Sequence, residues 1–119
     1  VEGLNILQTG VPKSGQDHVF VSDFLDFSVF VDADVADIES WFVERALAFC
    51  AGPFQQEDAY FHFLTRLKPE EVRKYAERVW REINCLNLEE NIMPSRGRAD
   101  LIVHKAANHG IESVALRKL

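Results

Sequence analysis

The chain has 119 residues, of which 47% are hydrophobic, and its formal net charge is −6 at pH 7. This length fits one domain with its own core, and the absence of any run of about eighteen apolar residues excludes an ordinary transmembrane helix. Residues 1–60 hold 11 acidic and 2 basic side chains, whereas residues 61–119 hold 8 and 11. Such a balance argues against a nucleic-acid-binding domain, which needs a strongly basic surface. The basic second half fits either an anionic small ligand or a solvated helix face.

The first part of the chain predicts a strand followed by a loop. Residues 1–7 resemble the last part of a buried strand, and Glu2 is a weak candidate for ligand chemistry at its carboxyl end. Residues 10–16 are turn-rich. They do not match the phosphate-binding pattern G-x-x-x-x-G-K-[ST], because Pro12 rather than Gly precedes Lys13.

A strand and a long helix follow. Residues 19–24 predict a short helix begun at Ser22 or Asp23, and the β-branched and aromatic residues 27–31 predict a buried strand. A helix is expected over residues 35–50. Strand, short loop and helix in this order indicate an α/β layer.

One face of the predicted helix carries both aromatics and a cation. Ile38, Phe42 and Phe49 recur at helical spacing, and Arg45 lies on the same face. A guanidinium is rarely buried without a partner. Arg45 therefore forms either a salt bridge at the rim or a bidentate contact with an anionic ligand in an aromatic-walled pocket.

The second half predicts two more helices and a hairpin. A short helix is expected over 57–67, and another opens at Pro69, which suits a first helical turn. The buried stripe of the latter is predicted at Val72, Tyr75 or Ala76, Val79 and Ile83, with Trp80 and Asn84 in an adjacent row. Asn84 is either a helix-end hydrogen bonder or a ligand contact.

Residues 100–119 predict a hairpin with a turn over 106–110, where Asn and Gly suit positive φ. The four histidines have no metal-ligand spacing, and no complete catalytic set is present. Cys50 and Cys85 are isolated, which fits a reducing cytoplasm. The residues alone thus predict a cytoplasmic α/β domain that binds a ligand.

Several long segments together resemble one family. They are EGLNILQTG at 2–10, HVFVSDFLDFSVFVDA at 18–33, WFVERALAF at 41–49, FQQEDAYFH at 54–62, VWREINCLNLEENIMPSRGRADLIVHKAANH at 79–109 and VALRKL at 114–119. These segments cover nearly the whole chain. They resemble the C-terminal part of the bacterial type I pantothenate kinase, which phosphorylates pantothenate with ATP at the first step of coenzyme A synthesis.

The resemblance implies a fold and an activity. Residues 1–119 would form the C-terminal part of a single kinase domain with a P-loop kinase-type three-layer fold, a mainly parallel sheet with flanking helices, and a C-terminal hairpin. The family's phosphate-binding loop, its residues that meet ATP and Mg²⁺, and its general base would lie upstream. This chain would then hold no catalytic and no metal-binding residue and would be inactive alone. The full-length enzyme is expected to be a cytoplasmic homodimer inhibited by coenzyme A, with no nucleic-acid or membrane partner.

The resemblance also implies roles for single residues. Arg45 and Asn84 match residues that hold pantothenate, and Asn108 and His109 match the nucleotide site. Aromatics that would line the pocket shared by pantothenate and the coenzyme A thiol arm are Phe49, Phe54, Tyr60 and Phe61. Phe42 stands where the family commonly has a tyrosine that contacts pantothenate, and Ala46 and Leu64 replace aromatics of some members.

Two other functions remain open at this point. The chain could be a non-catalytic fragment that binds pantothenate or coenzyme A, or part of a sister P-loop kinase that acts on a nucleoside or a sugar. A phosphate-binding motif upstream would separate the first of these from an enzyme.

Overall fold

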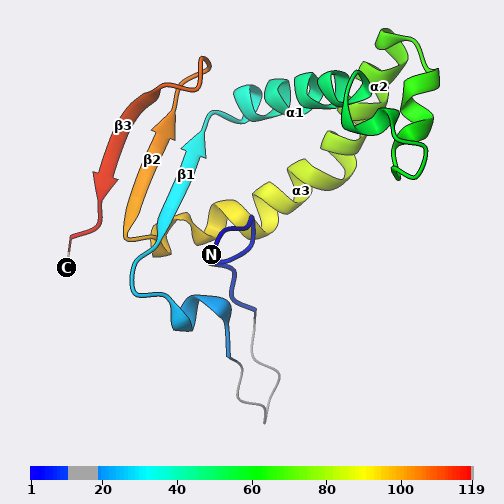
Figure 1. Ribbon diagram of the computed structural model, residues 1–119. Helices are drawn as coiled ribbons and strands as arrows, with labels where there is room; N and C mark the ends of the chain where they lie inside the picture. The colour runs from blue at the N-terminus through cyan, green and yellow to red at the C-terminus, as the bar shows by residue number, and fades with distance from the viewer. Residues whose placement is uncertain (11–18, 119) are drawn as a thin grey trace. The chain divides into compact units, whose positions relative to one another are not determined.

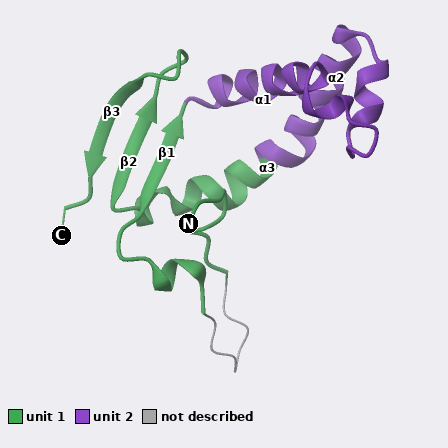
Figure 2. Cartoon of the chain, in the orientation of Figure 1, with its two compact units in different colours: residues 1–33, 86–119 green, residues 34–85 purple. Residues whose placement is uncertain are grey.

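The computed structural model describes residues 1–10 and 19–118. These residues form two compact units, coloured separately in Figure 2. Unit 1 consists of Val1–Ala33 and Leu86–Leu119, and unit 2 consists of Asp34–Cys85. In the part of the chain that is described, no helix is long and apolar enough to cross a membrane.

Unit 1 contains a three-stranded sheet of β1 (Val29–Ala33), β2 (Leu101–Lys105) and β3 (Ile111–Leu116), in that order (Figure 1). β1 and β2 are parallel, whereas β2 and β3 are antiparallel. The expectation of a mainly parallel sheet is therefore wrong for this chain. The reason is the connection: a short turn can join only antiparallel strands, whereas a parallel pair needs a long crossover. The C-terminal hairpin is confirmed.

β1 begins two residues later than predicted, and burial alternates along it up to Asp32. Phe30 and Asp32, on one face, are each 8% exposed, whereas Val29 and Val31, on the other face, are 50% and 62% exposed. This alternation is that of a strand covered on one side. The strand predicted as buried is thus buried along the face of Phe30 and Asp32, and Val29 and Val31 on its other face are exposed in the described chain.

The N-terminal segment forms a turn over residues 4–7 instead of the predicted strand. The Asn5 side chain donates to Asn87 Oδ1 (3.1 Å), and the Gln8 side chain donates to Asn91 Oδ1 (3.0 Å). Side-chain amides therefore hold this segment in place of a strand ladder. The predicted short helix near Ser22 is a 3-10 turn, η1 (Val21–Phe24). Of the predicted loop, residues 11–16 lie outside the described residues.

Unit 2 begins with α1 (Val35–Cys50), which has the predicted bounds. Asp34 precedes it in an extended conformation, and Gly52-Pro53 follows its end. Val43 is its buried residue at 3% exposure, and α1 packs against α2 (Pro69–Val79). The helix predicted over 57–67 is only a 3-10 segment, η3 (His62–Arg66), after the shorter η2 (Pro53–Gln55). There the Thr65 hydroxyl donates to the His62 carbonyl (2.7 Å) and competes with helical bonding.

α2 starts at the predicted proline. The N–H of Lys68, the residue before it, donates to the carboxylate of Glu71 in the first helical turn (3.3 Å). Val72 and Ala76 are buried as predicted, at 2% and 3% exposure. The helical chain then continues through a π-helical turn, η4 (Trp80–Asn84), a short α3 (Cys85–Asn87), a second π-helical turn, η5 (Leu88–Ile92), and a 3-10 segment, η6 (Met93–Arg98).

The prediction that Ile83 completes the buried stripe is wrong. Ile83 is 63% exposed, whereas Trp80 is 5% exposed. The π-helical turn explains this, because its wider i→i+5 hydrogen bonding changes which residues follow a given face.

Candidate functional site

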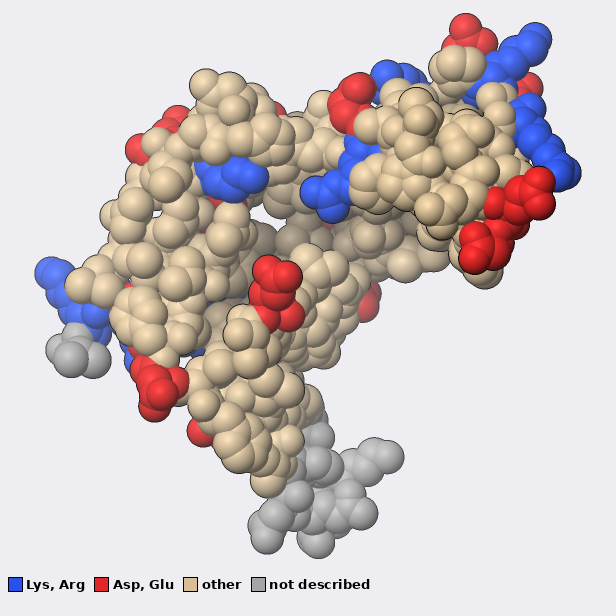
Figure 3. Space-filling model, viewed as in Figure 1, with Lys and Arg blue, Asp and Glu red and all other residues tan. Residues whose placement is uncertain are grey.

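A cavity of about 300 Å³ lies within unit 2. Its walls come from α1, α2, η4 and the 3-10 segments between the two helices. Its lining residues are Phe42, Arg45, Ala46, Phe49, Phe54, Phe61, Leu64, Tyr75, Ala76, Val79 and Asn84. This volume is at the lower end of the range of about 300–1,000 Å³ for small-molecule pockets, and a mostly apolar wall with few polar groups is typical of them. On the visible face of unit 2, charged side chains border a broad uncharged area (Figure 3).

Arg45 supplies the positive charge of this pocket. Its side chain makes no hydrogen bond or ion pair with any residue in the described ranges. The neighbouring Glu44 pairs instead with Arg73 at 3.2 Å, an exposed contact. The rim salt bridge that the sequence left open for Arg45 is therefore not seen between described residues. A guanidinium beside aromatic walls can bind a carboxylate or phosphate through two hydrogen bonds.

Asn84 supplies an amide to the same pocket. It is half-buried at the end of η4, and no described residue hydrogen-bonds its side chain. The carboxamide therefore has donors and an acceptor available for a ligand. The alternative of a helix-end hydrogen bond is not seen in the described chain.

Three phenylalanines form one wall by ring contacts. Phe49 and Phe54 meet edge to face with centroids 5.4 Å apart, and Phe54 and Phe61 are also 5.4 Å apart. The His62 ring contacts the Phe54 carbonyl oxygen at 2.8 Å, which ties η2 to η3. Tyr60 packs edge to face against Phe61 at 4.8 Å but is 85% exposed and does not line the cavity.

Phe42 also lines the cavity, and its ring contacts a buried partner. Its ring centroid lies 5.7 Å from that of Trp80. The sequence placed Trp80 beside the buried stripe and gave it no part in the site. Phe42 and Trp80 are two large aromatics that lie on or beside the predicted buried faces of two helices. That coincidence is the sequence signal that could have indicated their contact.

Comparison with curated proteins finds relatives that are similar over essentially the whole of this chain. Over its whole length the chain is 52% identical to the pantothenate kinase of Coxiella burnetii (strain RSA 493 / Nine Mile phase I). The match is to a C-terminal portion of this relative. The pantothenate kinases of Shigella dysenteriae serotype 1 and Yersinia enterocolitica are each 50% identical to it over 119 residues. The chain spans 38% of the length of each of these three relatives. No family model matches it.

The resemblance to pantothenate kinase is thus confirmed, and six of the seven residues predicted for the pantothenate pocket line one cavity. Tyr60 is the seventh; it packs against Phe61 and does not line the cavity. Asn108 and His109, predicted for the nucleotide, lie in the turn between β2 and β3 in unit 1. Asn108 Oδ1 accepts the Gly110 N–H (2.9 Å), and Lys105 Nζ lies 2.9 Å from His109 Nδ1. Among the described non-glycine residues, His109 is the one with a positive φ, at 68°. The sequence predicts instead that Asn or Gly takes the positive φ in this turn.

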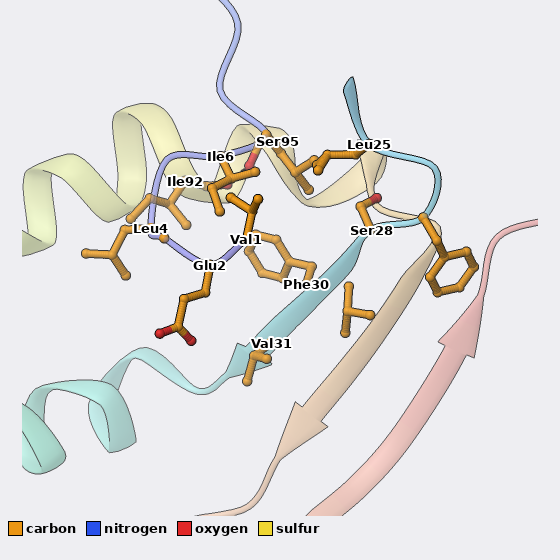
Figure 4. A pocket seen from close by; sticks show the side chains of 14 residues that line it. Val1, Glu2, Leu4, Ile6, Leu25, Ser28, Phe30, Val31, Ile92 and Ser95 are labelled. Atoms are coloured by element: carbon orange, nitrogen blue, oxygen red, sulfur yellow. The ribbon is translucent and has the colours of Figure 1, made fainter. Parts of the chain in front are cut away.

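A second cavity of about 430 Å³ lies in unit 1 between the N-terminal turn and β1 (Figure 4). Its apolar lining includes Val1, Leu4, Ile6, Leu25, Phe30, Val31 and Ile92. The hydroxyls of its serines already have partners, because Ser28 Oγ donates to Asp100 Oδ2 (3.0 Å) and Ser95 Oγ donates to the Ile92 carbonyl (2.6 Å). The charged residue of the lining is Glu2, which would repel an anion. This larger cavity therefore suits pantothenate less well than the pocket of Arg45.

Unit 1 also holds a charged cluster that the sequence did not predict. Asp32, at the end of β1, is 8% exposed and accepts hydrogen bonds from Arg96 Nε (3.0 Å) and His104 Nδ1 (3.3 Å). His104 Nε2 also lies 3.5 Å from Glu112. Burial by itself would raise the pKa of Asp32, but the hydrogen bonds and charges of Arg96 and His104 outweigh it and lower that pKa below its ordinary value. The described residues contain no group of metal-ligating side chains.

Proposed function

We propose that this chain forms the pantothenate-binding part of a pantothenate kinase, which transfers the terminal phosphoryl group of ATP to pantothenate. The observation that carries the proposal is an arginine and an asparagine without partners among the described residues, placed in one aromatic-walled pocket. The names of the relatives, which are pantothenate kinases, support the same activity.

The chemistry of pantothenate matches this pocket. The molecule has a carboxylate at one end, an amide in the middle and hydroxyls at the other end. Arg45 would hold the carboxylate by two charge-assisted hydrogen bonds, and Asn84 would bind the amide or a hydroxyl. Phe42, Phe49 and Phe54 would cover the apolar parts of the chain. These residues bind and orient the substrate, and the pocket walls exclude water from it.

Phosphoryl transfer needs groups that this sequence does not contain. Backbone amides of a phosphate-binding loop, a lysine and Mg²⁺ surround the phosphates in such kinases and neutralise their charge. No G-x-x-x-x-G-K-[ST] motif occurs in the 119 residues. The proposal therefore places ATP and Mg²⁺ mainly on another part of a P-loop kinase-type fold. Asn108 and His109 would add contacts to the nucleotide, and coenzyme A would compete at the aromatic wall. The full-length enzyme would be a cytoplasmic homodimer.

Calorimetric titration tests the binding half of this proposal. Pantothenate and pantothenol, its analogue with an alcohol in place of the carboxylate, are titrated separately into the full-length enzyme. The expected result is that pantothenol binds on the order of tenfold more weakly, because it cannot form the charge-assisted pair with Arg45. Equal affinities, or no binding of pantothenate, would contradict the assignment of this pocket.

A second candidate is a fragment that binds pantothenate or coenzyme A without catalysis, and the same pocket of unit 2 supports it. The two candidates differ in one measurement. A kinase forms ADP and phosphopantothenate in equal amounts when the full-length protein receives ATP, Mg²⁺ and pantothenate. A binding fragment forms neither product, although it still takes up the ligand.

A further inference from the structure

The π-helical turn η4 (Trp80–Asn84) directly follows α2 beside the pocket, and a second π-helical turn, η5, comes after the three residues of α3. The N–H of Cys85 donates to the carbonyl of Trp80, an i→i+5 hydrogen bond. Such a turn accommodates one more residue than an α-helical turn. π-helical turns are rare in proteins and occur often at functional sites.

The turn changes which side chain reaches the pocket. Tyr75, Ala76 and Val79 line the cavity from α2. In an unbroken α-helix the next residue on this face would be Ile83, four positions after Val79. Instead Ile83 is 63% exposed and Asn84 lines the cavity. The extra residue of the turn has moved the face by one position.

The start of the turn is anchored at the pocket wall. Trp80 is 5% exposed and packs its ring against Phe42, which itself lines the cavity. The carbonyl that accepts the i→i+5 hydrogen bond belongs to the same tryptophan. The packing of Trp80 against Phe42 within unit 2 therefore holds the first residue of the turn in place.

We propose that the π-helical turn is a specificity device: it presents the Asn84 amide to the pocket ligand and turns Ile83 out to solvent. The ligand class is a molecule with an amide or hydroxyl near its carboxylate, and this part of the inference rests on the proposed pantothenate pocket. An α-helical turn with the same sequence would place a branched alkyl group there and leave that polar part of the ligand unpaired.

A swap of the two side chains tests the binding consequence. The variants are Asn84→Ile, Ile83→Asn, and the double variant that carries both changes, each made in the full-length enzyme and checked for folding by thermal unfolding. The expected result is a loss of pantothenate affinity of roughly 5- to 100-fold in Asn84→Ile and in the double variant, since a polar ligand group loses its partner. Ile83→Asn is expected to bind as the wild type does. Wild-type affinity in the double variant, or tighter binding by Ile83→Asn, would overturn the proposal.

A labelling experiment tests the helix register without any ligand. Ile83→Cys and Asn84→Cys are each made in a Cys50→Ala/Cys85→Ala background, and their rates of reaction with a maleimide are compared. The expected result is a rate at position 83 several-fold higher than at position 84, and protection by pantothenate at position 84 alone. Equal or reversed rates would overturn the register. The two rates could also differ as expected while pantothenate neither protects position 84 nor binds to the wild type. That result would show that the register is right and the assigned ligand is wrong.

Discussion

Arg45 and Asn84 line the same pocket of unit 2, and neither side chain has a hydrogen-bond partner among the described residues. Arg45 comes from the middle of α1, and Asn84 from the end of the π-helical turn η4. Their pairing supplies one fixed positive charge and one amide against an aromatic wall. A ligand with a carboxylate and a nearby amide satisfies both.

Replacement of Arg45 by alanine is expected to impair the use of pantothenate far more than that of ATP. A charge-assisted contact contributes about 1.5–3 kcal/mol, so the KM for pantothenate should rise on the order of tenfold or more. Steady-state kinetics of the full-length enzyme with each substrate varied in turn measures this. Arg66→Ala, an exposed arginine outside the pocket lining, is the matched control. If both variants keep the wild-type KM and kcat, Arg45 does not bind the substrate.

Replacement of Phe42 by tyrosine is expected to tighten pantothenate binding. Phe42 lines the pocket and packs on Trp80, and the added hydroxyl would supply a hydrogen bond worth about 0.5–1.5 kcal/mol. The KM for ATP should change little. Calorimetric titration of pantothenate into both proteins measures the difference. Weaker binding by the tyrosine variant would mean that the oxygen is buried without a partner, which costs about 1–3 kcal/mol.

The 119-residue chain alone is expected to have no pantothenate kinase activity. Its sequence contains no phosphate-binding motif, and its described residues contain no group of metal-ligating side chains. Mass spectrometry of reactions with ATP, Mg²⁺ and pantothenate detects the phosphorylated product, and the full-length enzyme serves as the positive control. Product formed by the pure chain above a reaction without protein would refute this.

Replacement of Asp32 by asparagine is expected to lower the free energy of unfolding by about 1–2 kcal/mol at pH 7, because Arg96 and His104 lose a charged partner. The pKa of Asp32 in the folded state lies below its ordinary 3.8, so its contribution is fully present above that pH and is lost as the pH falls through the folded-state value. The difference between wild type and variant should therefore shrink below about pH 4.

Urea unfolding of both proteins at a series of pH values from 7 to 3 measures this difference. Asp58→Asn, at an exposed position, is the control for the loss of one negative charge. A stability difference that stays constant down to pH 3 would show that Asp32 does not act through its charge.

Elements bounded by strong local signals were predictable from the sequence. The bounds of α1 and the start of α2 at Pro69 are as predicted, because capping, proline and glycine act within a turn or two of the chain. The hairpin is predictable for the same reason. The strand predicted over residues 1–7 and the helix predicted over 57–67 had weaker local signals. In the structure a turn and a 3-10 segment stand there, with side-chain hydrogen bonds from Asn5 and Thr65.

The composition of the pocket was also within reach of the sequence, since Phe42, Arg45 and Phe49 share one helical face and the motifs supply Phe54, Phe61 and Asn84. Two features were not. Helical periodicity predicts Ile83 on the buried face, and only the i→i+5 bonding of η4 exchanges it for Asn84. The cluster of Asp32, Arg96 and His104 arises because β2 pairs with β1 in a register that sets Asp32 opposite His104. Local periodicity and capping are properties of neighbouring residues, whereas helix register and strand pairing depend on contacts between distant parts of the chain, and those contacts exist only in the folded molecule.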